Sequence, residues 1–176
     1  MSSFETDANI RELHQACKDG SADIVKHLLQ QKVRASSFDP RGRPPIVVAA
    51  VHGNAACVRL LCQHNIPVDQ QTYKSGDTAL SLVLASFVAA NTMPVPGLYE
   101  AEKHARADKK RRARNAGLEE VVVTLLQLGA DPSTPRPSAT PLHIASHRGF
   151  DSAVRLLLSG RYYHVNDYGE RVTPSV

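Results

Sequence analysis

Apolar residues along the chain recur in pairs of short segments that are separated by a glycine turn. Residues 13–20 end at a glycine and lead into an apolar stripe at 24–29. Within each segment the apolar positions follow the i, i+3, i+4 spacing of an amphipathic helix. The same arrangement returns at 46–62 and at 142–158. The pattern therefore predicts helix–turn–helix units, each with a first helix, a turn and a second helix.

These units recur at a nearly fixed period. Gly20 and Gly53 lie 33 positions apart, as do Leu13 and Ile46. A period of this length indicates a repeat architecture. Another unit opens at Gly76 and closes over 117–131, but about 30 extra residues, 87–116, split it. Because a single helix pair cannot bury its own apolar stripe, we predict that neighbouring units stack into an all-α solenoid.

Two short motifs point to a particular repeat family. Thr140-Pro141-Leu142-His143 would begin a first helix, and Gly129-Ala130-Asp131 would follow a second helix. In this register the chain resembles ankyrin repeats over about 6–86 and 117–167. The resemblance implies one ankyrin-repeat domain over 1–176, built as a stack of four units. The expected repeats are about 6–38, 39–72, 73–134 with the insertion 87–116, and 135–167, followed by a partial fifth repeat or cap at 168–176.

Small residues and caps should define the ends and contacts of the first helices. Gly20, Gly53, Gly117 and Gly149 are expected to terminate helices, since glycine tolerates a left-handed backbone. Thr140 is expected to cap the helix that Pro141 begins. Alanines at 16, 49, 50 and 145 should let the first helices approach closely. In the split unit, helix-forming residues continue to about Ala90, so its first helix is expected to be extended.

Composition excludes several classes of protein. The chain has 176 residues, of which 42% are hydrophobic, enough to build a core rather than a disordered chain. It has no apolar run of the roughly 18 residues that a membrane span needs. Its three cysteines do not suggest a disulfide framework, and we expect reduced, buried thiols.

The net charge of +4 is concentrated in the insertion. Residues 100–116 hold seven basic and three acidic side chains, so the rest of the chain is neutral. The densest part is Lys109, Lys110, Arg111, Arg112 and Arg114. This composition is typical of a nuclear import signal or an anionic-surface contact, and more commonly of a solvated charged helix. Residues 98–114 are rich in helix formers, and the segment 93–97 should separate them from the preceding helix.

No residue pattern indicates catalysis. His143 and His147 have the i, i+4 spacing of some zinc ligands, but no third ligand is near in sequence, and we predict no metal. The chain has no C-x-x-C, phosphate loop, G-x-S-x-G or dinucleotide fingerprint. We expect a protein that is not an enzyme and that requires no cofactor.

The resemblance to ankyrin repeats implies a protein-binding surface along the hairpin tips and the exposed ends of the first helices. Carried over to this sequence, that surface comprises Lys18, Asp19, Arg41, Arg43, His52, Tyr73, Lys74, Asp77, Arg136, His147 and Arg148. Its bases outnumber its acids. We therefore predict a basic concave groove that prefers an acidic or phosphorylated segment of another protein.

The sequence is compatible with three functions. The first is a monomeric protein–protein interaction module, cytoplasmic and part of a larger adaptor or multidomain protein. The second is a nuclear or nucleic-acid-associated factor that uses the cluster at 109–114. The third is the regulatory ankyrin domain of a larger enzyme. Salt-dependent binding to duplex nucleic acid would separate the second from the first, because phosphate contacts weaken steeply with salt.

Overall fold

The computed structural model describes the backbone of residues 3–87, 98–133, 139–159, 164–165 and 171–172. Side chains are described for 7–87, 108–133 and 139–159. Eight helices lie in these ranges: α1 (Ser3–Asp19), α2 (Ala22–Gln30), α3 (Pro45–Val51), α4 (Ala55–Gln63), α5 (Ala79–Ser86), α6 (Leu98–Gln127), α7 (Pro141–His147) and α8 (Asp151–Ser159). A short antiparallel pair, β1 (His164–Val165) and β2 (Arg171–Val172), follows them.

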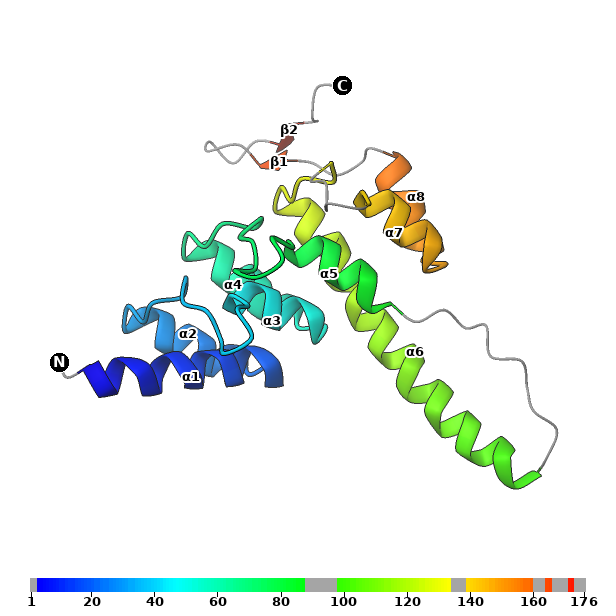
Figure 1. Ribbon diagram of the computed structural model, residues 1–176, viewed down its shortest axis with the longest axis horizontal. Helices are drawn as coiled ribbons and strands as arrows, with labels where there is room; N and C mark the ends of the chain where they lie inside the picture. The colour runs from blue at the N-terminus through cyan, green and yellow to red at the C-terminus, as the bar shows by residue number, and fades with distance from the viewer. Residues whose placement is uncertain (1–2, 88–97, 134–138, 160–163, 166–170, 173–176) are drawn as a thin grey trace.

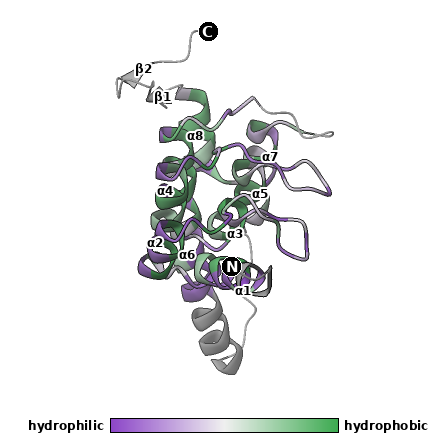
Figure 2. Cartoon of the chain, turned by 90° about the vertical axis from the view of Figure 1, so that its left-hand side faces the viewer, coloured by the Kyte–Doolittle hydropathy of each residue, from purple (hydrophilic) through white to green (hydrophobic). Residues whose placement is uncertain are grey.

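The helices form two layers, as the repeat pattern predicts. The first helices α1, α3, α5 and α7 pack against one another in chain order, and the second helices α2, α4, α6 and α8 do the same. Figure 1 shows the successive helix pairs stacked along the chain, and Figure 2 shows the two layers. The predicted helical solenoid is confirmed. Among the described elements, only the strand pair was not predicted.

The core runs between the layers through every unit. Leu13, Ile46, Leu61, Leu80 and Leu125 are completely buried, and each comes from a different helix. The four alanines expected between first helices are also buried, at 4% exposure or less. Burial of such side chains is the main stabilising contribution in a stack whose units contact only their neighbours.

Two first helices begin with threonine caps, of which the one at Thr140 was predicted from the sequence. Thr140 accepts a hydrogen bond from the backbone N–H of His143 at 3.4 Å, and Pro141 is the first helical residue. Thr78 caps α5 by accepting a hydrogen bond from the N–H of Ser81 at 3.3 Å. A threonine cap of this kind satisfies one of the backbone donors left open at a helix start.

The prediction that Gly117 ends a helix is wrong. Gly20, Gly53 and Gly149 lie after first helices with φ of 78°, 82° and 64°, as expected. Gly117 instead lies inside α6, which runs through it without a break for 30 residues. A Cβ built on Gly117 would lie 3.4 Å from the carbonyl oxygen of Gly53. The missing side chain therefore lets α6 pass close to the turn between α3 and α4.

The insertion is also organised differently from the prediction. The first helix of the split unit ends at Ser86, with Phe87 extended after it, whereas the predicted extension would have continued the helix past this point. From Leu98 onward the insertion forms one helix with the second helix of its unit, and this helix projects beyond the stack (Figure 1). The predicted break at 93–97 lies outside the described residues, as does most of the predicted cap at 168–176.

Candidate functional site: a groove between α1 and α3

A groove of about 750 Å³ lies between α1, the loop after α2 and the end of α3. We call it the α1–α3 groove. Its α1 side chains share one face, because their positions follow helical spacing. The lining comprises Asp7, Ile10, Arg11, His14, Gln15, Lys18, Phe38, Asp39, Pro40, Arg41, Arg43, Val51 and His52.

Four of the predicted binding residues meet in this groove. Lys18 comes from α1, Arg41 and Arg43 come from the loop, and His52 follows α3. The loop cations lie opposite the helix cations because the chain reverses at Asp39-Pro40-Arg41-Gly42. This turn is closed by a 2.8 Å hydrogen bond from the N–H of Gly42 to the carbonyl of Asp39. Gly42 has φ 78°, a conformation that favours glycine at a turn.

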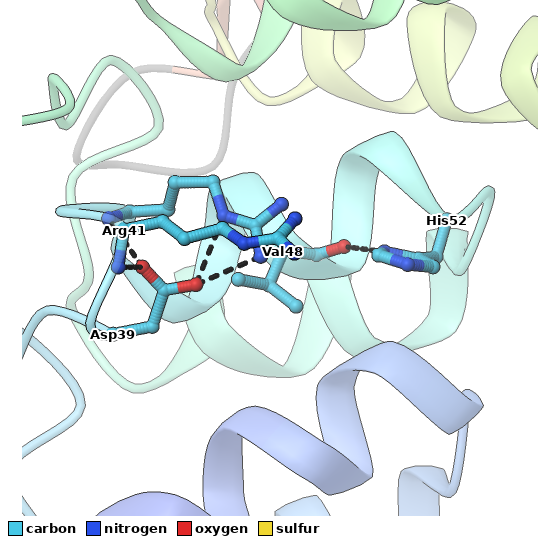
Figure 3. Close-up of polar contacts among 5 residues, drawn as sticks. Asp39, Arg41, Val48 and His52 are labelled. Atoms are coloured by element: carbon cyan, nitrogen blue, oxygen red, sulfur yellow. Dashed lines mark hydrogen bonds and ion pairs between the residues drawn. The ribbon is translucent and has the colours of Figure 1, made fainter.

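Asp39 holds the loop (Figure 3), and it also neutralises Arg43. Its carboxylate accepts bonds from the backbone N–H groups of Arg41 and Arg43 at 2.9 and 2.8 Å. It also accepts two bonds from the Arg43 guanidinium, at 2.9 Å from Nε and 2.8 Å from Nη2. Burial opposes ionisation of Asp39, but the hydrogen bonds and charge of Arg43 prevail and lower its pKa. Arg43 is therefore a structural residue of the groove wall, and its charge is already paired.

We expect Asp39→Asn to destabilise the protein by about 1–2 kcal/mol, because the substitution weakens a partly buried, charge-assisted pair. The loss should depend on pH. Since folding lowers the pKa of Asp39, its stabilisation is complete above the ordinary aspartate value of 3.8 and disappears as pH falls through the lower folded-state pKa. Urea unfolding of both proteins between pH 7 and pH 2 would measure this. A difference in unfolding free energy that stayed constant over that range would contradict the assignment.

The remaining groove cations have no ion pair among the described residues. Arg11, Lys18 and Arg41 are exposed, and the ion pairs of the described part of the chain involve other side chains. Asp7 is the acidic lining residue that remains once Asp39 has paired with Arg43. The groove therefore presents three available cations against one carboxylate, which favours an anionic ligand.

Two histidines line the same groove and differ in exposure. His14 is only 9% exposed, and neither ring nitrogen makes a hydrogen bond among the described residues. Burial lowers the pKa of His14, although the charge of Asp39 and the backbone of Ser37 oppose this effect. The His14 ring is therefore neutral near pH 7. His52 is exposed, and its Nδ1 lies 2.9 Å from the carbonyl of Val48 (Figure 3).

An aromatic pair borders the groove at the hairpin tips. The rings of Phe38 and Tyr73 have centroids 6.0 Å apart, and they are 44% and 80% exposed. The N–H of Tyr73 donates to the carbonyl of Gly42 at 2.8 Å, which joins the first hairpin loop to the second. Exposed aromatic side chains beside cations are of the kinds that dominate protein interfaces. Lys74, next along the second loop, is exposed as predicted.

Asp77 is a correction to the predicted surface. It is only 6% exposed. Its carboxylate accepts a 2.6 Å bond from the Ser75 hydroxyl, and its N–H donates to Thr72 Oγ1 at 3.0 Å. Asp77 thus stabilises the second hairpin turn from inside, because Ser75 and Thr72 of the same loop bind its carboxylate and its backbone N–H.

The other predicted residues lie apart from the groove lining. Asp19 is exposed at the end of α1 and accepts a 2.8 Å bond from Gln15. His147 and Arg148 are exposed at the end of α7, two units farther along the stack. Arg136 lies outside the described residues. The basic cluster is on α6, where Lys109, Lys110, Arg112 and Arg114 are exposed and Arg111 pairs with Asp108 at 2.9 Å.

Sequence reasoning missed nine of the thirteen residues that line the groove. Arg11, His14, Phe38 and Asp39 line it but were not among the predicted binding residues. One signal was present for α1: Asp7, Arg11, His14 and Lys18 follow i, i+4, i+7, i+11 spacing. That spacing places all four side chains on one face of a helix. The position of Phe38 depends on how two loops pack, which no local pattern encodes.

Neither the described cysteines nor the potential metal ligands among the described residues form an arrangement typical of a catalytic site. Burial raises the pKa of Cys17 and Cys57, and it raises the pKa of the partly buried Cys62 to about 11. Thiols with raised pKa values are poor nucleophiles. Within the described residues no cluster of three or more His, Cys, Asp or Glu side chains could bind a metal ion. No helix in this part of the chain combines the length and hydrophobicity needed to cross a membrane.

The fold defines a class of helical repeat proteins whose hairpin loops and first helices border a groove. Family models agree with this class: one for ankyrin repeats in three copies matches residues 13–87, and one for a single ankyrin repeat matches 139–168. The chain belongs to the ankyrin-repeat family. Ankyrin repeats generally act as protein–protein interaction modules.

Two curated relatives are much longer proteins. The nuclear factor NF-kappa-B p105 subunit of Gallus gallus is 28% identical over 160 residues, which is 89% of this chain and 13% of that protein. An ankyrin repeat-containing protein of Saccharomyces cerevisiae is 32% identical over 68 residues, or 39% of this chain and 13% of that protein. The chain thus spans about 13% of the length of each relative.

Proposed function

We propose that this chain is a non-catalytic module that binds another protein through the α1–α3 groove and prefers an acidic or phosphorylated segment. The observation that carries the proposal is the set of Arg11, Lys18 and Arg41, three exposed cations in one groove with no ion pair among the described residues. Arginine side chains bind carboxylate and phosphate oxygens through two parallel hydrogen bonds. Phe38 adds an apolar surface beside them for a neighbouring side chain of the partner.

The much greater length of the relatives supports a place within a larger adaptor or multidomain protein. We propose that the module acts as a monomer, since its cationic groove is complete within a single chain. We further propose that it acts in the cytoplasm or the nucleus. The positive charge of the groove selects against basic segments of a partner, because like charges repel across an interface.

The test is charge reversal in the groove. We expect Lys18→Glu with Arg41→Glu to weaken binding to the natural partner by about fourfold or more, since two attractions become repulsions worth about 0.2–1 kcal/mol each way. Partners would be captured from native lysate, identified by mass spectrometry and measured by titration calorimetry. Treating the lysate with phosphatase distinguishes phosphorylated partners from acidic ones.

A matched control reverses two exposed cations elsewhere. Lys26→Glu with Arg155→Glu makes the same change in net charge on α2 and α8, outside the groove lining. This control should capture the same partners as the unmodified chain. Equal loss in both variants, or no loss in either, would exclude the groove as the binding surface.

A further inference from the structure

The part of α6 that precedes Gly117 carries a basic face. Side chains are described here for 108–116, and the exposed ones include Lys109, Lys110, Arg112 and Arg114. At roughly 100° per residue, these four cations fall within about 200° of the helix circumference. Asp108, Arg111 and Asn115 occupy the opposite side and are only partly exposed. We call the four exposed cations the α6 basic face.

The helix projects from the stack, so this face is accessible. Figure 1 shows the N-terminal half of α6 extending beyond the other helices. No residue of the α6 basic face lines the α1–α3 groove. The charge is also local, because residues 100–116 account for the entire net charge of +4. A polyanionic ligand would therefore be attracted to α6 as well as to the α1–α3 groove.

The side-chain composition of the α6 basic face favours one class of partner over the others. Between 108 and 116 the apolar side chains are only Ala113 and Ala116. A protein interface usually contains aromatic or aliphatic anchors, and an interfacial membrane helix inserts Trp, Phe or Leu. Contacts with the phosphates of a nucleic acid need cations and no apolar anchor. The major groove of B-DNA, about 12 Å wide, also admits a single α-helix.

We propose that the α6 basic face binds the phosphate backbone of duplex nucleic acid without reading its sequence. The four long cationic side chains reach the phosphates that border a groove, while the two alanines allow the helix to approach closely. The one amide side chain in 108–116 that could pair with adenine, Asn115, lies on the opposite side of the helix, and we assign the Lys and Arg side chains of the face to phosphates rather than to guanine. Binding is therefore governed by charge and is independent of the proposed groove function.

Fluorescence anisotropy with a labelled random-sequence DNA duplex of about 20 base pairs tests the proposal directly. Four neutralised phosphates predict a slope of about −3.6 for log K against log salt, or a loss of about 10²-fold in affinity between about 50 and 200 mM salt. Absence of binding at the lower salt concentration would overturn the proposal. A slope near zero would do the same.

A pair of triple variants locates the contact. Lys109→Gln, Lys110→Gln and Arg114→Gln together should lower the magnitude of the salt slope by about 3, since each neutralised contact contributes about one unit. Arg112 is retained because it also lines a hollow against the start of α8. The control, Lys26→Gln, Arg34→Gln and Arg155→Gln, removes three exposed cations elsewhere and should keep the slope of the unmodified chain. Equal effects of the two variants would overturn the assignment to α6.

Competitors separate duplex nucleic acid from other polyanions. Unlabelled duplex should displace the probe, whereas poly-glutamate of matched charge and vesicles of one-third anionic phospholipid should not. Displacement by poly-glutamate at equal charge concentration would replace the proposal with an acidic protein partner. Displacement by the vesicles would replace it with a membrane surface. Circular dichroism of each variant establishes that its helical content is retained.

Discussion

Replacing Leu80 by alanine is expected to destabilise the protein by about 2–5 kcal/mol, the range for deleting a buried leucine side chain. Leu80 is completely buried in α5, which packs against α3, α6 and α7. Because a repeat stack is held together by contacts between neighbouring units, the cavity weakens two interfaces at once. The free energy of unfolding would be measured by urea denaturation followed by circular dichroism.

Leu158→Ala provides the comparison. This side chain is 68% exposed on α8, so its truncation should change stability by less than about 0.5 kcal/mol. Similar losses in the two variants would mean that burial in the central unit does not determine the stability of the stack. A broadened or two-step transition in Leu80→Ala would indicate that the N-terminal and C-terminal units had become uncoupled.

Gly53→Val should be the second severe substitution, with a cost of about 3 kcal/mol or more. Gly53 has φ 82°, a region in which β-branched residues are strained. A Cβ at this position would also lie 3.3 Å from the carbonyl carbon of Gly117, so the side chain would press on the backbone of α6. Backbone strain and overpacking therefore both destabilise the Gly53→Val variant. Urea denaturation would again give the free energy of unfolding.

Gly76→Val separates these two contributions. Gly76 has φ 65°, but a Cβ at this position would have as its nearest neighbour a glutamine side-chain oxygen 3.9 Å away. Its substitution should cost only the backbone strain, about 1–2 kcal/mol. If Gly53→Val cost no more than Gly76→Val, the close approach of α6 to the α3–α4 turn would not contribute to stability.

The fold was largely predictable because its signals are local and repeated. The periodic apolar residues, the Thr140 cap and the glycines after first helices each encode a short-range preference, and the structure confirms them. Gly117 was predicted wrongly for the same reason. A glycine can end a helix or let two backbones approach, and the choice here depends on Gly53, which is distant in sequence.

The candidate groove was only partly predictable. Charge and family resemblance located Lys18, Arg41 and His52, but they could not show that Asp39 pairs with Arg43. Asp77 illustrates the opposite error, because a polar residue at a predicted loop tip lies inside the turn. Such distinctions depend on which loop atoms meet one another, and neither periodicity nor composition carries that information.

The uninterrupted course of α6 through Gly117 places a constraint on length changes in this part of the chain. Each residue inserted between Gly117 and the basic cluster would rotate the preceding cations by roughly 100° about the helix axis. A single insertion would turn part of the cluster toward the other helices, whereas an insertion of about seven residues, close to two full turns, would nearly restore the original direction. Related proteins that preserve this helix should therefore vary here in steps of whole turns.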